Sequence, residues 1–342
     1  MLRHAVILLT GASGEIGHGL ITRLAQTESR PIITVDLNPL AKELASLVHH
    51  QYIGSILDGQ LLDRILAEFE IDLIFHLAAL LSTRSEFAPA MAHRVNVEGT
   101  MAMLEFAQRQ GESHGRPVQF MYPSSIAAYG LPSLKTKDQA GKVKEDDANH
   151  PTTMYGCNKL YCEQLGRYYA RYYKQLAAVK LAGKVDFRCI RFPGLISAAT
   201  APSGGTSDYA SEMIHAAAQG KPYACFARPD TRIPFMAMPD GVEALLKLAM
   251  ASSEQLTQNV YNIGAFNPSA GELRERVLRE FPNANITTRV DEKRQAILDT
   301  WPENVDDSAA RRDWGLAPRY DVEGAFRDYL FPAVRKRYLN RG

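Results

Sequence analysis

The chain has 342 residues, 46% of them hydrophobic, so it is long enough to bury one large core or two modest ones. Its 39 basic and 38 acidic side chains nearly cancel. The chain therefore lacks the excess of positive charge that is typical of proteins that bind nucleic acid or an anionic membrane. The first apolar run, residues 5–9, is too short for a signal peptide or a membrane span. We therefore expect a cytoplasmic protein that binds neither nucleic acid nor a membrane.

In the first half of the chain, short apolar runs alternate with longer stretches of helical period. The runs typical of β-strands are residues 4–10, 31–36, 49–54, 71–78, 117–125 and 185–192. The stretches with the spacing of amphipathic helices are residues 15–27, 58–70 and 91–111. Strands that alternate with helices form a parallel sheet covered on both faces, so we expect a doubly wound α/β domain over residues 1–192.

Later in the chain the pattern is less regular. Residues 131–151 are polar, charged and bounded by prolines, which predicts a loop. A helix that begins near Tyr155 is expected to run unusually far, to about residue 184. The short elements that follow predict a smaller, mainly substrate-binding lobe over residues 193–342, with some elements returning to the core.

A glycine-rich turn follows the first predicted strand directly. It contains Gly11, Gly14 and Gly17, and it opens the first predicted helix. Such glycines let the backbone approach a pyrophosphate, whose charge is stabilised by the free N–H groups at the helix N-terminus. Asp36 ends the second strand, where a carboxylate accepts a hydrogen bond from a ribose hydroxyl and repels a 2′-phosphate. The pattern predicts a Rossmann-like domain that binds NAD rather than NADP.

A second motif places Tyr155 and Lys159 four residues apart, on one face of the helix that follows the fifth predicted strand. A phenol with its usual pKa of about 10 is a poor base at neutral pH, and an ammonium one turn away favours the phenolate. The preceding strand ends in Ser124 and Ser125, of which Ser125 is the favoured partner for a reacting oxygen. The alternative interpretation is an ordinary amphipathic helix with a surface lysine.

The cysteines and histidines show no metal-binding spacing. Cys157, Cys162, Cys189 and Cys225 form no C-x-x-C pair, so we expect buried free thiols rather than disulfides or metal ligands. His76 lies inside an apolar run, which is typical of a histidine in a protein core. We expect no metal site.

Together these motifs resemble the extended short-chain dehydrogenase/reductase superfamily, which includes the nucleotide-sugar epimerases and dehydratases. The stretches HLAALLS, PSSIAAYG, RFPGLIS, GGTSDYA and TWPENVDDSAARRDWG are similar to those of its metal-independent L-threonine 3-dehydrogenases. The resemblance implies contacts with NAD from Gly11, Gly14, Gly17, Asp36, Asp58, Leu77, Ala78 and Lys159. It implies catalysis by Ser125, Tyr155 and Lys159. It implies contacts with the substrate from Ser82, Gly205, Thr206, Ser207, Asp208 and Trp301.

The resemblance also implies a reaction and an assembly. A homodimer would use NAD to oxidise the β-hydroxyl of a small hydroxy amino acid, L-threonine, to 2-amino-3-oxobutanoate. The alternatives are a dehydrogenase of another short hydroxy acid, a nucleotide-sugar epimerase or dehydratase, and a non-catalytic regulator that senses NAD. Regulators of that kind typically lose the tyrosine–lysine pair, which this chain keeps.

The stretch SGGTSDYA, residues 203–210, has two candidate roles. Serine, threonine and aspartate are preferred N-cap residues, so Ser207 or Asp208 is expected to cap a helix that runs to Gly220. The same stretch suits a small zwitterion, because its N–H and hydroxyl groups would bind a carboxylate and Asp208 an ammonium. We expect both roles, and the expectation of substrate contact rests mainly on the resemblance.

Overall fold

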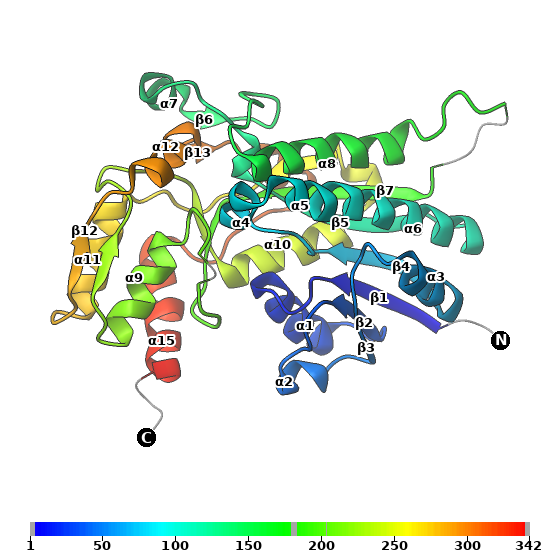
Figure 1. Cartoon of the computed structure of the whole chain (residues 1–342), viewed down its shortest axis with the longest axis horizontal. Helices are drawn as coiled ribbons and strands as arrows, with labels where there is room; N and C mark the ends of the chain where they lie inside the picture. Colours follow the sequence, from blue (N-terminus) through cyan, green and yellow to red (C-terminus); the bar gives the residue numbers. More distant parts are fainter. Residues whose placement is uncertain (1–3, 179–182, 203, 339–342) are drawn as a thin grey trace. The chain divides into compact units, whose positions relative to one another are not determined.

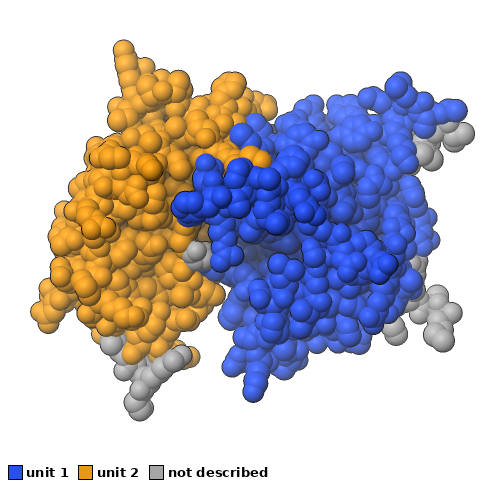
Figure 2. Space-filling model, in the orientation of Figure 1, with its two compact units in different colours: residues 1–124, 157–190, 245–260 blue, residues 125–156, 191–244, 261–342 orange. Residues whose placement is uncertain are grey.

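The computed structural model describes residues 4–178, 183–202 and 204–338 (Figure 1). The chain packs into two compact units whose segments interleave along the sequence (Figure 2). Unit 1 consists of Met1–Ser124, Cys157–Ile190 and Leu245–Val260, and unit 2 consists of Ser125–Gly156, Arg191–Ala244 and Tyr261–Gly342. The division at residue 192 expected from the sequence stays a prediction.

The largest sheet has seven parallel strands, which confirms the predicted doubly wound α/β fold. In their spatial order, the strands are β11 (Val260–Asn262), β7 (Val185–Phe192), β5 (Val118–Ser125), β4 (Phe69–His76), β1 (His4–Thr10), β2 (Ile32–Asp36) and β3 (His50–Ile53). The order of the strands reverses at β1, which pairs with β2 on one side and with β4 on the other. Ligands of such sheets bind at this reversal, outside the carboxyl ends of the strands.

Helices cover both faces of these strands, with α1 on one side and α6 and α8 on the other (Figure 1). The helices of this part of the chain are α1 (Glu15–Thr27), α2 (Lys42–Ala45), α3 (Gly59–Glu68), α4 (Ser82–Phe87), α5 (Pro89–His93), the π-helical η1 (Arg94–Glu98), α6 (Gly99–His114) and α8 (Met154–Arg171). The core of unit 1 lies between helices and sheet and buries side chains such as Val6, Ile33 and Phe187 completely.

Unit 2 contains short strands paired two by two, all in parallel. The pairs are β8 (Gly194–Ile196) with β10 (Phe235–Ala237), β9 (Tyr223–Cys225) with β12 (Ile286–Thr288), and β6 (Lys142–Val143) with β13 (Asn304–Val305). The remaining helices are the 3-10 turns η2 (Ile126–Ala128) and η3 (Ser253–Gln255), α7 (Leu134–Ala140), α9 (Tyr209–Ala218), α10 (Met238–Met250), α11 (Ala270–Glu280), α12 (Glu292–Thr300), α13 (Ser308–Trp314), α14 (Val322–Gly324), the π-helical η4 (Ala325–Leu330) and α15 (Phe331–Tyr338). The core of unit 2 includes Trp301, Phe235 and Tyr209.

The prediction of a loop over residues 131–151 is wrong, because this segment contains α7 and β6. Ser133 caps α7 by accepting a hydrogen bond from the Thr136 N–H, at 3.1 Å. Lys137 is buried, and its ammonium donates to the Leu298 carbonyl at 3.0 Å. The polar composition is misleading here because a long-range partner satisfies the buried charge.

The prediction that the helix from Tyr155 reaches residue 184 is also wrong, since α8 ends at Arg171. Turns follow directly, and Lys174 has a positive φ of 45° that no right-handed helix can continue. Tyr173 then packs against Tyr169 in the core of unit 1, with ring centroids 5.3 Å apart. Residues 179–182 lie outside the described part of the chain.

All four cysteines are free, but the expectation that all are buried is wrong for Cys157. That thiol is exposed, while Cys162, one and a half turns further along α8, is buried. No group of three or more acidic, histidine or cysteine side chains within residues 4–178, 183–202 and 204–338 has the geometry to hold a metal ion. None of the helices described in these ranges is long and apolar enough to cross a membrane.

Candidate active site

The glycine-rich turn lies at the carboxyl end of β1, where the strand order of the sheet reverses. Gly11 has a positive φ of 67°, and its Cα faces the Leu77–Ala78 backbone at the end of β4. A Cβ at this position would lie 2.5 Å from the Ala78 nitrogen, so no other residue fits there. The fold therefore brings three of the predicted cofactor residues, Gly11, Leu77 and Ala78, together at one edge of the sheet.

The N-terminus of α1 begins at the end of this turn. Gly14 is its N-cap residue, no side chain caps its first turn, and Gly17 lies in that turn. The first N–H groups of a helix lack partners within the helix and carry a partial positive charge. Bare backbone and an uncapped helix end together fit the pyrophosphate of a dinucleotide, so the residues present suit NAD.

Asp36 ends β2 beside the same turn. Its two carboxylate oxygens accept hydrogen bonds from the Ser13 N–H and the Asn38 N–H, each at 2.9 Å. These bonds fix a carboxylate next to the glycine-rich turn, as expected of a partner for a ribose hydroxyl. Asp58 has a structural role as well, since it caps α3 through the Gln60 and Leu61 N–H groups.

A network of buried polar side chains supports the loop after β4. Asn96 accepts a hydrogen bond from the Leu80 N–H at 2.8 Å and donates to the Leu80 carbonyl at 3.1 Å. Ser82 begins α4 two residues later and is largely buried. His76 contacts the hydroxyls of Thr10 and Thr100, at 2.7 and 3.1 Å. Burial lowers the pKa of this histidine to about 3, so the imidazole is neutral and serves the core, as predicted.

The two serines at the end of β5 differ in environment. Ser124 is buried, and its hydroxyl donates to the Glu163 carboxylate at 2.5 Å. Ser125 is half-buried, and its oxygen accepts a local hydrogen bond from the Ala127 N–H, at 3.1 Å, as the cap of η2. The Ser125 hydroxyl keeps its own proton to donate, which favours Ser125 over Ser124 as the partner of a reacting oxygen.

Tyr155 lies in the first turn of α8 and packs against the core of unit 2. The next residue, Gly156, lies so close to η2 that a Cβ would be 2.0 Å from the Ala127 carbonyl oxygen. This close approach keeps the start of α8 beside the turn that Ser125 caps. Burial raises the pKa of the Tyr155 phenol, so the phenolate needs a positive charge to form near neutral pH.

Lys159 lies one turn further along α8 and is almost completely buried. Its ammonium donates to the Pro123 carbonyl at 2.6 Å and lies over the Tyr122 ring, 4.5 Å from the centroid. Burial lowers the pKa of Lys159 to about 8, which the nearby Cys162, Cys189 and Glu163 partly oppose. The interpretation of Lys159 as a surface lysine is therefore wrong.

In unit 2, the loop before α9 is closed by its own side chains. Asp208 occupies the N-cap position, but its carboxylate caps no N–H of the helix and instead accepts from the Gly205 N–H at 2.7 Å. The expected side-chain cap is thus corrected to a closed turn over residues 205–208. Thr206 is buried, and Ser207 is half-buried beside it.

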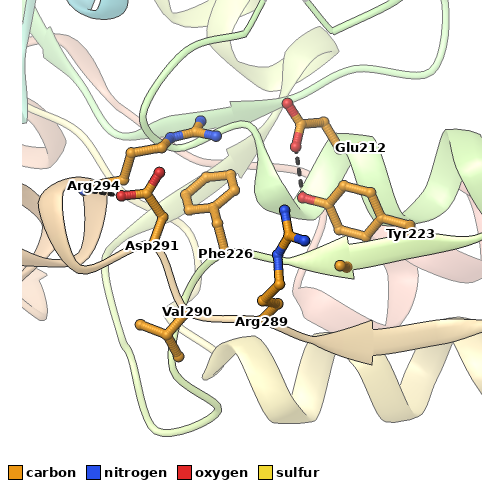
Figure 3. A pocket seen from close by; sticks show the side chains of 8 residues that line it. Glu212, Tyr223, Phe226, Arg289, Val290, Asp291 and Arg294 are labelled. Atoms are coloured by element: carbon orange, nitrogen blue, oxygen red, sulfur yellow. Dashed lines mark hydrogen bonds between the residues drawn. The ribbon is translucent and has the colours of Figure 1, made fainter.

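Arg294 of α12, drawn beside Asp291 and the Phe226 ring in Figure 3, binds this turn. Its guanidinium donates to the Gly205 carbonyl at 2.8 Å and lies over the Phe226 ring, 3.2 Å from the centroid. Phe226 meets Tyr209, the first residue of α9, edge to face. Arg294 and Phe226 also line a cavity of about 470 Å³. Trp301, which directly follows α12, is buried in the core of the same unit.

Three residues of these networks, Asn96, Glu163 and Arg294, were missed by the sequence-based reasoning. Each is a polar or charged residue on a helix whose hydrogen-bond partner lies more than 15 positions away. A polar residue within an otherwise apolar helix face is the signal that could have pointed to Asn96 and Glu163. Arg294 lies in the charged stretch DEKRQ and carries no such signal.

Comparison with known proteins agrees with this geometry. Residues 7–264 match the model of the NAD dependent epimerase/dehydratase family. The chain belongs to the NAD-dependent epimerase/dehydratase family. The relatives that are similar over most of its length include L-threonine 3-dehydrogenases and uncharacterized epimerase/dehydratases. The chain is an NAD-dependent oxidoreductase.

Three of these relatives show the extent of the similarity. The mitochondrial L-threonine 3-dehydrogenase of Bos taurus is 34% identical over 322 residues, which cover 92% of this chain and 79% of that protein. The solved structure of L-threonine 3-dehydrogenase from Trypanosoma brucei is 34% identical, has a TM-score of 0.83, and covers 96% of this chain and 97% of its own. The holo form of an L-threonine dehydrogenase from Cupriavidus necator is 32% identical, has a TM-score of 0.81, and covers 98% and 100%.

The position of Asp36 predicts how this member of the epimerase/dehydratase family selects its cofactor. Asp36→Asn removes the charge but keeps an acceptor oxygen for the Ser13 or Asn38 N–H. We expect the wild type to bind NAD at least about 10-fold more tightly than NADP, and the variant to lose most of that difference because the 2′-phosphate is no longer repelled. Calorimetric titration with both dinucleotides measures the ratio, and an unchanged ratio in Asp36→Asn would contradict the assignment.

Proposed function

We propose that this protein oxidises the β-hydroxyl of L-threonine to 2-amino-3-oxobutanoate and reduces NAD to NADH. The observation that carries the proposal is the buried ammonium of Lys159, held one turn from Tyr155 on α8. The relatives support the choice of substrate, since the similar proteins of Bos taurus and Trypanosoma brucei are L-threonine 3-dehydrogenases.

The proposed roles follow from the environments of the side chains. Lys159 stabilises the Tyr155 phenolate, which removes the proton from the β-hydroxyl, while Ser125 donates a hydrogen bond to the same oxygen. When bound, NAD accepts the hydride that leaves the β-carbon. The proton and the hydride together account for both hydrogens that the substrate loses.

The cofactor would be held by residues of unit 1. Gly11, Gly14 and Gly17 bind the pyrophosphate, and Asp36 binds a ribose. Asp58, Leu77 and Ala78 complete the contacts with NAD that we propose. Lys159 would contact the nicotinamide ribose in addition to its effect on Tyr155.

The substrate would be held by polar groups from several segments of the chain. The closed turn over residues 205–208 offers N–H and hydroxyl groups for a carboxylate, and the Asp208 carboxylate for an ammonium. Ser82 and Trp301 are the further contacts that we propose. The homodimer and the cytoplasmic location stay predictions, and they do not affect these assignments.

An assay of NADH formation with several substrates tests the proposed reaction. L-threonine, L-serine, 3-hydroxybutyrate and UDP-glucose are compared at the same NAD concentration. We expect L-threonine to give the highest kcat/KM, and Tyr155→Phe to lower it about 10²- to 10⁴-fold because the general base is lost. Calorimetry should show that this variant still binds NAD.

The same assay separates the alternatives. An epimerase returns its cofactor to the starting form, so loss of UDP-glucose, followed by chromatography of the same reaction, without net NADH would indicate a nucleotide-sugar epimerase. Oxidation of 3-hydroxybutyrate in place of either amino acid would indicate another hydroxy-acid dehydrogenase. If no substrate is oxidised or otherwise converted while NAD binds, the non-catalytic regulator is favoured and the proposal is wrong.

A variant of Asp208 tests the substrate turn. Asp208→Asn keeps an oxygen that can accept from the Gly205 N–H but removes the negative charge. We expect the KM for L-threonine to rise at least about 10-fold with the KM for NAD unchanged, because an ammonium loses its anion. Glu212→Gln is the matched control: it removes a carboxylate one turn along α9 that accepts a hydrogen bond from Tyr223. Equal effects of both substitutions on the KM for L-threonine would show that Asp208 has no specific role.

A further inference from the structure

Glu163 is a buried acid that the proposed reaction does not use. It lies on α8, one turn beyond Lys159, and only 1% of its surface is exposed. Burial of a carboxylate is costly unless hydrogen bonds or opposite charges compensate. Its carboxylate accepts a hydrogen bond from the Ser124 hydroxyl at 2.5 Å, and the Lys159 ammonium is its neighbour on the same helix face.

Pro123 and Ser124, consecutive residues near the end of β5, are thereby hydrogen-bonded to Lys159 and Glu163, which lie one turn apart on α8. The Pro123 carbonyl accepts from the Lys159 ammonium at 2.6 Å, and the Ser124 hydroxyl donates to Glu163. All four residues belong to unit 1. The strand end that leads directly to Ser125 is therefore fixed to the helix by a cation and an anion together.

Cys162, Cys189 and Glu163 all favour the charged form of Lys159, against the effect of burial. The titratable and aromatic groups that face the ammonium are Cys162 and Glu163 on α8, Cys189 on β7, Tyr122 on β5 and His76 on β4. Burial raises the pKa of the Cys162 thiol and lowers that of His76, so both are neutral at working pH. Glu163 is the carboxylic acid among the groups that favour the charged form of the lysine.

We propose that Glu163 is a positioning residue of the active site: it ties the end of β5 to α8 through Ser124 and balances the charge of Lys159. This inference rests on the proposed role of Lys159 in the reaction. Glu163 contacts neither substrate nor cofactor in this scheme and acts through Lys159 and the strand end.

The test compares Glu163→Gln, Glu163→Asp and Ser124→Ala with the wild type. The pH profile of kcat/KM reports groups of the free enzyme, so its alkaline limb should follow the loss of charge at Lys159, near pH 8. We expect Glu163→Gln to move this limb down by about 1 pH unit, because a lost opposite charge lowers the pKa of a lysine. Ser124→Ala removes the tie but keeps the charge, so it should lower kcat and leave the limb in place.

Two controls make the outcome specific. Glu163→Asp should retain the limb of the wild type while lowering kcat, since the charge stays and the hydrogen bond lengthens. Glu105→Gln removes a carboxylate on α6 that accepts from Tyr169 of α8, and should change neither quantity. Thermal melting confirms that each variant is folded; if Glu163→Gln does not fold, Ser124→Ala and Glu163→Asp still test the tie between β5 and α8, and unchanged kcat in both would overturn the inference.

A measurement without substrate separates this inference from the proposed function. The ¹³Cε chemical shift of Lys159 gives its pKa directly in labelled protein, with Lys159→Arg used for assignment. A lower pKa in Glu163→Gln supports the inference even if L-threonine is not oxidised. The inference is overturned if the pKa of Lys159 and the alkaline limb are the same in Glu163→Gln as in the wild type, or if Glu105→Gln shifts them equally.

Discussion

The burial of one cation, the ammonium of Lys159, is the constraint on which the arrangement of the active site depends. A charge in this environment must be compensated, and the Pro123 carbonyl, the Tyr122 ring and Glu163 do so. These partners lie on the last residues of β5 and on α8 itself. Both elements are held at this contact, which lies next to Ser125 at the end of β5 and one turn from Tyr155 on α8.

Two further features depend on this contact. Ser125 follows the fixed strand end and caps η2, and Gly156 lets the start of α8 approach the same turn. Tyr155 lies between Gly156 and the preceding loop, in the first turn of the helix. Tyr155 and Lys159 are one helical turn apart on α8, so the helix places the proposed base and the residue proposed to activate it on the same face.

Local patterns in the sequence were sufficient to predict most of the large parallel sheet and its first helix. Periodicity places six of the seven strands of the sheet, and α1 runs over the predicted residues 15–27. The glycine-rich turn and Asp36 are also predictable, because strand, turn and helix follow each other within a few residues. The strand β11 was missed, since three residues, Val260–Asn262, are too few for any periodicity.

Features that depend on distant partners could not be predicted in this way. Lys137 can be buried because the Leu298 carbonyl, 161 positions away, accepts a hydrogen bond from its ammonium. The surrounding segment contains α7 and β6 and is therefore not a loop. Asp208 stands at the predicted cap position, but its carboxylate turns back to Gly205, whose carbonyl is bound by Arg294. Glutamate on a helix is typically exposed, so nothing in the local sequence marks Glu163 as buried. Only the fold places it beside Ser124.

Taken together, the geometry and the relatives support a single chemical step, in which a hydride leaves the β-carbon of a hydroxy amino acid. L-threonine with deuterium at that carbon tests this step most directly, with the NADH product examined by mass spectrometry. We expect the NADH to carry one deuterium, and Lys159→Met to form little labelled NADH while still binding NAD. Formation of unlabelled NADH by the wild type, or label transfer at the wild-type rate in Lys159→Met, would contradict the account.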